Sequence, residues 1–205
     1  MSAAGSPVLI LATLNRGKAH ELIALLDDVP FEIRVLADYP GAVAPQENET
    51  TYRGNALLKA RAAVRLTGAW SLGDDSGLEV DALGGGPGLH SARYGGPGLD
   101  DAGRCALLLA ALRDVPDHRR TARFRCAIAI VDPNGHEWVV EGVAEGVITR
   151  EPRGAGGFGY DPLFYYPPLG RTFAELSDAE KSDVSHRGRA AAEARRVLTS
   201  ANPPA

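Results

Sequence analysis

Short apolar runs and helical apolar stripes follow one another along this chain. Residues 8–12 form a continuous apolar run of strand length, which predicts a buried strand. A polar turn follows, and the next apolar side chains have the i, i+3, i+4, i+7 spacing of an amphipathic helix. These side chains are Ala19, Leu22, Ile23 and Leu26. Residues 31–36 predict a second strand.

The middle of the chain continues this pattern. Thr50 or Thr51 can cap a helix that carries small apolar residues on one face. Residues 70–73 predict a strand, and residues 74–77 (Asp-Asp-Ser-Gly) have the composition of a turn. A strand resumes over residues 78–82.

The second half predicts two more helices and a long hairpin. Asp100 or Asp101 can cap a helix with an apolar stripe, and Ser185 can cap the last helix. Residues 124–130 alternate in polarity, residues 138–148 are extended, and Asn134-Gly135 lies between them as a strong hairpin signal. Mixed strands and helices of this kind predict an α/β or α+β fold with a mixed sheet.

Composition limits the function classes. The chain has 205 residues, 44% of them hydrophobic and 23% charged, as in one globular domain. The net charge of -4 disfavours nucleic acid as the main partner, since such proteins carry a basic face. Two distant cysteines indicate a reducing compartment and no zinc site. No apolar run is long enough for a signal peptide or a membrane span, so we expect a cytoplasmic protein.

The first polar cluster, Thr13-Leu14-Asn15-Arg16-Gly17-Lys18, lies between the first strand and the first helix. Backbone N–H groups at a helix start, with a lysine beside them, can hold a phosphate. A P-loop is excluded, because Ala12 and Ala19 stand where that motif needs glycine and Ser or Thr. The alternative is a turn with a solvated lysine.

The second cluster is Asp74-Asp75-Ser76-Gly77. Neighbouring carboxylates can hold a hard cation such as Mg²⁺ and orient a water molecule. Glu47, from an earlier loop, can supply a second oxygen ligand if the fold brings it near. The alternative is an acid-rich turn without a ligand.

Two further clusters lie in the second half. Residues 154–161 match G-x-G-x-x-G, but Asp161-Pro162 prevents the helix that a dinucleotide fingerprint must open. They predict a loop presenting Phe158 and Tyr160, on which a base can stack, or else a turn with buried aromatic rings. His186 and Arg187 lie in the first turn of the last helix, where cations oppose the dipole, which indicates a ligand with acceptors. The alternative is two exposed side chains.

Taken in order, these clusters resemble the inosine triphosphate pyrophosphatase family, also called dITP/XTP pyrophosphatases. The motifs that carry the resemblance extend from Ala12-Thr13-x-Asn15-x-Gly17-Lys18 and Asp74-Asp75-Ser76-Gly77-Leu78 to Gly156-Gly157-Phe158-Gly159-Tyr160-Asp161 and Ser185-His186-Arg187-Gly188. The resemblance implies an elongated mixed β-sheet flanked by helices. It also implies one domain over residues 1–205, with two lobes and the active site in the cleft between them.

The resemblance also implies the activity and its residues. Non-canonical purine nucleoside triphosphates (ITP, dITP, XTP) are expected to be cleaved to monophosphate and pyrophosphate with Mg²⁺, by a homodimer. Asp75 is the expected base, with Lys18 as a second catalytic residue and Glu47 as the second metal ligand beside Asp75. The expected substrate-binding residues are Thr13, Leu14, Asn15, Arg16, Gly17, Lys18, Lys59, Ser76, Phe158, Gly159, Tyr160, Asp161, Lys181, His186 and Arg187.

Three points stay open. The sequence does not decide whether Asp74 or Asp75 is the base. A Maf-like pyrophosphatase acting on other modified nucleotides is one alternative function. A nucleotide sensor that binds without turnover is the other, although the presence of both Asp75 and Lys18 argues against it.

Overall fold

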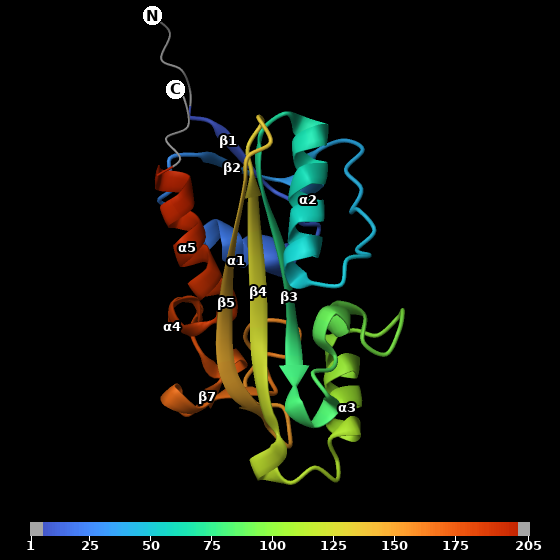
Figure 1. Cartoon of the computed structure of the whole chain (residues 1–205). Coiled ribbons are helices and arrows are strands. Elements are labelled where there is room, and N and C mark those ends of the chain that lie inside the picture. Colours follow the sequence, from blue (N-terminus) through green and yellow to red (C-terminus); the bar gives the residue numbers. More distant parts are fainter. Residues whose placement is uncertain (1–5, 201–205) are drawn as a thin grey trace, which may run out of the picture. The chain divides into compact units, whose positions relative to one another are not determined.

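The computed structural model describes residues 6–200 and has a mixed sheet flanked by helices (Figure 1). The described strands form one seven-stranded sheet in the order β2-β1-β3-β4-β5-β6-β7. Strand β1 pairs in parallel with β2 and β3, whereas β6 pairs antiparallel with β5 and β7. The strands are β1 (Val8–Leu11), β2 (Glu32–Val35), β3 (Trp70–Val80), β4 (Thr121–Val131), β5 (Glu137–Ile148), β6 (Phe164–Tyr166) and β7 (Arg171–Thr172). The predicted α/β class is confirmed.

The helices are α1 (Arg16–Leu25), α2 (Tyr52–Thr67), α3 (Asp101–Ala111), α4 (Asp178–Val184) and α5 (His186–Ser200). Within residues 6–200, none of them is long and apolar enough to cross a membrane. Residues 1–5, which also entered the expectation about targeting, lie outside the described range.

The chain divides into two compact units. The first unit consists of Met1–Asp75, Cys126–Gly142 and Arg187–Ala205. The second consists of Ser76–Arg125 and Val143–His186. Each unit therefore combines segments that are distant in the sequence.

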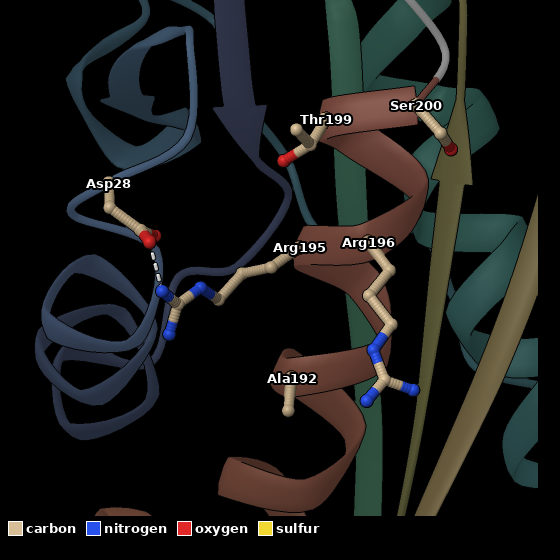
Figure 2. Close-up of a pocket in the computed structure, with 6 residues that line it drawn as sticks. All are labelled: Asp28, Ala192, Arg195, Arg196, Thr199 and Ser200. Carbon is tan, nitrogen blue, oxygen red and sulfur yellow. Dashed lines mark hydrogen bonds and ion pairs between the residues drawn. The ribbon is translucent and has the colours of Figure 1, made fainter.

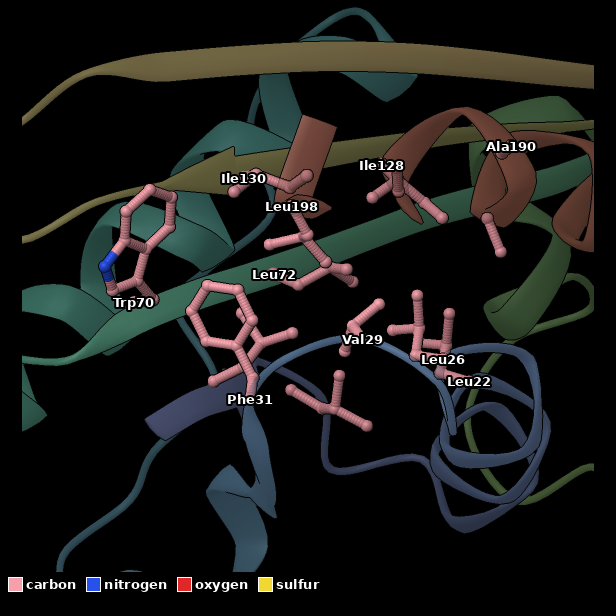
Figure 3. Packing of buried hydrophobic residues seen from close by; sticks show 14 of the residues in the cluster. Leu22, Leu26, Val29, Phe31, Trp70, Leu72, Ile128, Ile130, Ala190 and Leu198 are labelled. Carbon is pink, nitrogen blue, oxygen red and sulfur yellow. The ribbon is translucent and has the colours of Figure 1, made fainter. Parts of the chain in front are cut away.

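The core of the first unit follows from the alternation of side chains along β1. Successive residues of a strand point to opposite faces of the sheet. Leu9 and Leu11 accordingly pack with residues of α1 and α5, whereas Ile10 packs with Ala63 of α2. Figure 3 shows the first of these clusters, with Leu22, Leu26 and Leu198 turned toward Leu72 and Phe31. Helices α1 and α5 thus cover one face of this part of the sheet, and α2 covers the other (Figure 1).

Helix α2 approaches β3 closely because small residues meet at the contact. Ala56 and Ala60 are fully buried, and the hydroxyl of Ser71 donates to the carbonyl of Ala60 at 2.6 Å. A Cβ atom on Gly73 would lie 2.2 Å from the carbonyl oxygen of Ala56. The close approach needs glycine here, and it fixes how far the side chains of α2 reach along β3.

We therefore expect Gly73→Ala to destabilise the fold by about 1–3 kcal/mol, the usual cost of overpacking a core. The clash is with backbone, which cannot turn away as a flexible side chain can. Urea unfolding measures this cost. A Gly73→Ala protein as stable as the wild type would show that α2 does not need this contact.

The predicted turn at residues 74–77 is wrong. Strand β3 runs without interruption from Trp70 to Val80. Asp and Ser favour turns because their side chains bond the nearby backbone, and Gly favours them because it adopts positive φ without steric cost. Here Asp74 and Asp75 are buried and bound by other side chains, so tertiary contacts override the local preference.

Other local predictions are confirmed. The backbone N–H of Gly135 donates to Asp132 O at 3.1 Å in the β4–β5 hairpin turn. Thr51 and Asp100 cap α2 and α3 by accepting from Gly54 N at 3.0 Å and Gly103 N at 2.8 Å. The sequence patterns did not predict α4, which begins with a capping box formed by Ser177 and Glu180.

Candidate functional site

The segment between β1 and α1 has the geometry of a helix start facing solvent. The Asn15 side chain caps α1 by accepting from Lys18 N at 3.0 Å, and Thr13 Oγ1 accepts from Asn15 N at 3.1 Å. Leu14, Asn15 and Arg16 are exposed, and Gly17 is half-buried. The first backbone N–H groups of a helix have no partner within the helix, so such a start can bind an anion.

Lys18 turns away from bulk solvent and pairs with the carboxylate of Asp74. Its side chain is only 15% exposed, so the alternative of a solvated lysine is wrong. Asp74 of β3 instead holds the ammonium group of Lys18 in place. The charge of Lys18 also opposes the rise that burial causes in the pKa of Asp75.

Asp74 is the buried centre of a charged network. Its side chain is fully buried, and Oδ2 accepts from Arg187 Nε at 3.3 Å and from the Cys126 thiol at 3.0 Å. Arg187 also pairs with Glu21 at 2.5 Å. Burial alone raises the pKa of Asp74, but Lys18, Arg187 and Lys59 outweigh it and hold that pKa far below its usual range. Asp74 is therefore ionised at any working pH.

Asp75 has different partners because it points to the opposite face of β3. Lys59 Nζ donates to Oδ1 at 3.0 Å, and Asn55 Nδ2 donates to Oδ2 at 3.1 Å. Asn55 and Lys59 lie one turn apart on α2, so both reach the same carboxylate. Burial raises the pKa of Asp75 above its usual value, against the opposing effects of Lys59 and Lys18. A raised pKa suits a carboxylate that accepts a proton near neutral pH.

Glu47 belongs to the same group. Lys59 Nζ donates to Glu47 Oε1 at 2.9 Å as well as to Asp75, and Glu47 further raises the pKa of Asp75. Burial lowers the pKa of Lys59, but the charges of Asp75, Asp74 and Glu47 outweigh burial, so the pKa of Lys59 is raised overall. One lysine therefore bridges two carboxylates from different segments.

This oxygen donor set fits Mg²⁺. That ion takes one or two protein carboxylates and completes its shell with water and substrate phosphate. Within residues 6–200, no group of three or more His, Cys, Asp or Glu side chains could hold a metal ion. That Asp75 and Glu47 hold such an ion together with a phosphate ligand stays a prediction.

Three residues of this network received no role from the sequence. Asn55 is one of them, yet its side chain donates to Asp75 and also accepts from Glu49 N at 3.2 Å. Glu21 and Cys126 complete the surroundings of Arg187 and Asp74. Asn55 was the detectable one, because it is a polar residue beside the alanine face of an otherwise amphipathic helix.

The glycine-rich loop of the second unit is ordered around Asp161. Asp161 Oδ2 accepts from Phe158 N at 2.9 Å and from Lys181 Nζ at 2.5 Å. The Lys181 ammonium lies 5.1 Å from the centre of the Phe158 ring, within the range of a cation–π contact. Gly157 has a φ of +69° and passes so close to Asp161 that a Cβ would meet its carboxylate at 2.1 Å.

Tyr160 is placed differently from the expectation. It is 4% exposed, and its hydroxyl donates to Ser91 O at 2.9 Å, so its ring belongs to the core of the second unit. The loop thus presents Phe158, which is half-buried, and not Tyr160. Tyr160 is therefore a buried aromatic ring, and base stacking on Phe158 stays a prediction.

His186 and Arg187 are both buried, at 4% and 2% exposure, so the alternative of two exposed side chains is wrong. The imidazole of His186 stacks on Phe124 with ring centres 4.6 Å apart. Arg187 Nε and Nη1 are engaged by Asp74 and Glu21, so its expected contact with the nucleoside stays a prediction. Ser76 is the first residue of the second unit and is half-buried.

A pocket lies on the surface of the first unit, beside α5 (Figure 2). Its two arginines already have acidic partners, Asp28 for Arg195 and Glu193 for Arg196. It contains none of the residues singled out from the sequence. The charged network around Asp74 and Asp75 is the stronger candidate.

The chain is similar to known proteins over most of its length. The chain is 50% identical over 190 residues to the dITP/XTP pyrophosphatase of Desulforamulus reducens, covering 93% of this chain and 94% of that protein. It is 49% identical to the dITP/XTP pyrophosphatase of Geobacter sulfurreducens, with coverage of 90% and 92%.

Solved structures agree. A HAM1 protein from Coxiella burnetii superposes with a TM-score of 0.85 at 41% identity, covering 95% of this chain and 99% of that one. A dITP/XTP pyrophosphatase from Mycobacterium abscessus gives a TM-score of 0.72 at 46% identity, with coverage of 91% and 96%. The sequence also matches the Ham1 family over residues 9–197, and the chain therefore belongs to the Ham1 family.

Proposed function

We propose that this chain hydrolyses non-standard purine nucleoside triphosphates (dITP, ITP and XTP) to the monophosphate and pyrophosphate. The observation that carries the proposal is the Asp75 carboxylate, bound by Lys59 and Asn55 beside Glu47, with Lys18 paired to the adjacent Asp74. The relatives described above, which are named dITP/XTP pyrophosphatases, supply the substrate class.

The triphosphate binds at the start of α1. The first N–H groups of the helix donate to phosphate oxygens, and Thr13, Asn15 and Lys18 add side-chain contacts. Asp74 holds the Lys18 ammonium in the loop before the substrate arrives. Such preorganised charge stabilises the extra negative charge of a phosphoryl transition state without reorganisation at the moment of reaction.

Asp75 activates the water. Its carboxylate accepts a proton as the water oxygen forms a bond to the α-phosphorus, and the bond from the α-phosphorus to the bridging oxygen breaks. Pyrophosphate leaves with that oxygen. Asn55 and Lys59 keep the carboxylate in one orientation, and Lys59, with its raised pKa, stays charged.

Asp75 and Glu47 would hold Mg²⁺ together with the substrate. The bound ion neutralises phosphate charge and acidifies its water. The network has four carboxylates (Glu21, Glu47, Asp74 and Asp75) and three cations (Lys18, Lys59 and Arg187), which leaves a single net negative charge. A single net negative charge binds a divalent cation weakly, so we expect Mg²⁺ to bind together with the triphosphate and not to be held permanently.

Nucleoside contacts are proposed for Phe158, Lys181 and His186. Phe158 offers a ring face for the base, and Lys181 and His186 offer donors for a 6-oxo group, which ITP and XTP carry and ATP lacks. Sites built on hydrogen bonds discriminate strongly against a group of the wrong polarity, by as much as ~10⁴–10⁵.

A substrate panel tests the proposal. With Mg²⁺, pyrophosphate release from dITP and XTP is expected to exceed release from ATP by at least ~10² in kcat/KM, and EDTA is expected to abolish it. Modified pyrimidine triphosphates serve as the contrast. Preference for these would favour Maf-like chemistry, and tight dITP binding without any release would indicate a sensor.

We further propose a homodimer in the cytoplasm with a small-molecule nucleotide as its partner, and with no nucleic acid or membrane partner. The family resemblance supports the dimer, and the net charge of -4 supports the absence of nucleic acid. Light scattering during size-exclusion chromatography tests the dimer directly, since a monomeric mass at micromolar concentration would contradict it.

A further inference from the structure

Helix α3 touches the glycine-rich loop at one residue from two sides. The Gly159 N–H donates to Asp101 Oδ2 at 2.8 Å, and the Cys105 thiol donates to Gly159 O at 3.4 Å. Asp101 and Cys105 are four residues apart on α3, so they share one face of the helix. Both polar groups of the Gly159 backbone are therefore engaged by α3.

Gly159 directly follows Phe158, the aromatic residue that the loop presents. Residues 154–159 contain four glycines, so the loop has few side chains of its own to restrict it. Asp161 fixes the N–H of Phe158, and Asp101 fixes the next N–H along the chain. The orientation of the Phe158 ring depends on both peptide groups.

We infer that Asp101 is a positioning residue for nucleoside binding, which acts by holding the Gly159 backbone so that Phe158 faces the base. This inference rests on the proposed function of the loop. Asp101 Oδ1 also pairs with Arg104 Nη1 at 3.6 Å, and neither Arg104 nor Gly159 has a role in the proposed chemical step, so the effect of Asp101 is expected on substrate binding. A carboxylate accepting from an N–H makes a charge-assisted bond, stronger than a neutral one.

The test compares Asp101→Ala with two matched variants. Asp101→Ala is expected to raise the KM for dITP about three- to tenfold with kcat unchanged, the usual worth of one hydrogen bond. Asp101→Asn keeps an oxygen acceptor and is expected to restore most of the wild-type KM. Asp100→Ala removes the cap of the same helix without touching the loop, so it is expected to lower Tm by about 2–4 °C while KM stays near wild type.

Two further measurements separate the possible failures. Inhibition by inorganic tripolyphosphate, which lacks a base, is expected to be the same in Asp101→Ala and wild type. Hydrogen exchange of residues 154–161 in the full chain without nucleotide is expected to quicken in Asp101→Ala and not in Asp101→Asn.

The outcomes are distinct. An unchanged KM and unchanged exchange in Asp101→Ala would overturn the inference, as would an equal rise in KM for Asp100→Ala or weaker tripolyphosphate inhibition. A wild-type protein that releases no pyrophosphate from dITP would refute the proposed function instead, and the exchange comparison would still decide whether Asp101 holds the loop.

Discussion

Replacing Asp75 by Asn is expected to lower kcat for dITP by about 10²–10⁴, the usual contribution of a positioned general base. The amide keeps the shape of the side chain, but it cannot accept a proton from water at neutral pH. It also removes one charge from the pair that would hold Mg²⁺. Steady-state and single-turnover kinetics with dITP and Mg²⁺ measure the loss.

Asp132→Asn is the matched control, because Asp132 is also a buried carboxylate of the first unit but lies in the β4–β5 turn, where it bonds His136. Its kcat is expected to stay within about twofold of wild type, since Asp132 contacts no residue of the network around Asp75. Full activity in Asp75→Asn would remove Asp75 from the mechanism and reopen the role of Asp74.

Asp74→Asn is expected to destabilise the protein by about 3–5 kcal/mol, because removing one partner of a buried ion pair leaves the other charges uncompensated. Lys18 and Arg187 both lose the carboxylate that they share. The pKa of Asp74 is held far below its usual value, so its contribution is complete above the unfolded value of about 3.9 and is lost only in acid. The difference from wild type is therefore expected to be the same at pH 6 and pH 8.

Urea unfolding at both pH values measures this difference. Asp81→Asn is the control, since Asp81 pairs with Arg123 on the surface with its side chain 44% exposed. Exposed pairs contribute about 1 kcal/mol or less. If the two variants lose equal stability, Asp74 is not the centre of a buried network.

Much of the fold could be predicted from periodicity. Residues 8–12, the stripe from Ala19 to Leu26 and the Asn134-Gly135 turn each have one dominant local signal, and β1, α1 and the β4–β5 hairpin follow them. The turn predicted for residues 74–77 was wrong because contacts with distant residues outweigh the local turn preference. The partners of Asp74 and Asp75 come from α1, α2, β4 and α5. Sequence distance conceals such contacts.

The charged network brings together several residues singled out from the sequence, but its geometry and the parts played by Asn55, Glu21 and Cys126 were not predicted. Asp74 and Asp75 were treated as neighbours on one ligand, whereas strand alternation sends them to opposite faces. Asp74 is a buried anion with a lowered pKa, whereas Asp75 has a raised pKa. The sequence alone left that choice open, because it depends on which helix covers which face.

Hydrolysis of dITP in ¹⁸O-labelled water tests the central claim most directly. Attack on the α-phosphorus predicts one ¹⁸O atom in the monophosphate and none in the released pyrophosphate. Label in pyrophosphate, or release of labelled phosphate with a nucleoside diphosphate, would place the attack at another phosphorus and contradict the mechanism built on Asp75 and Lys18.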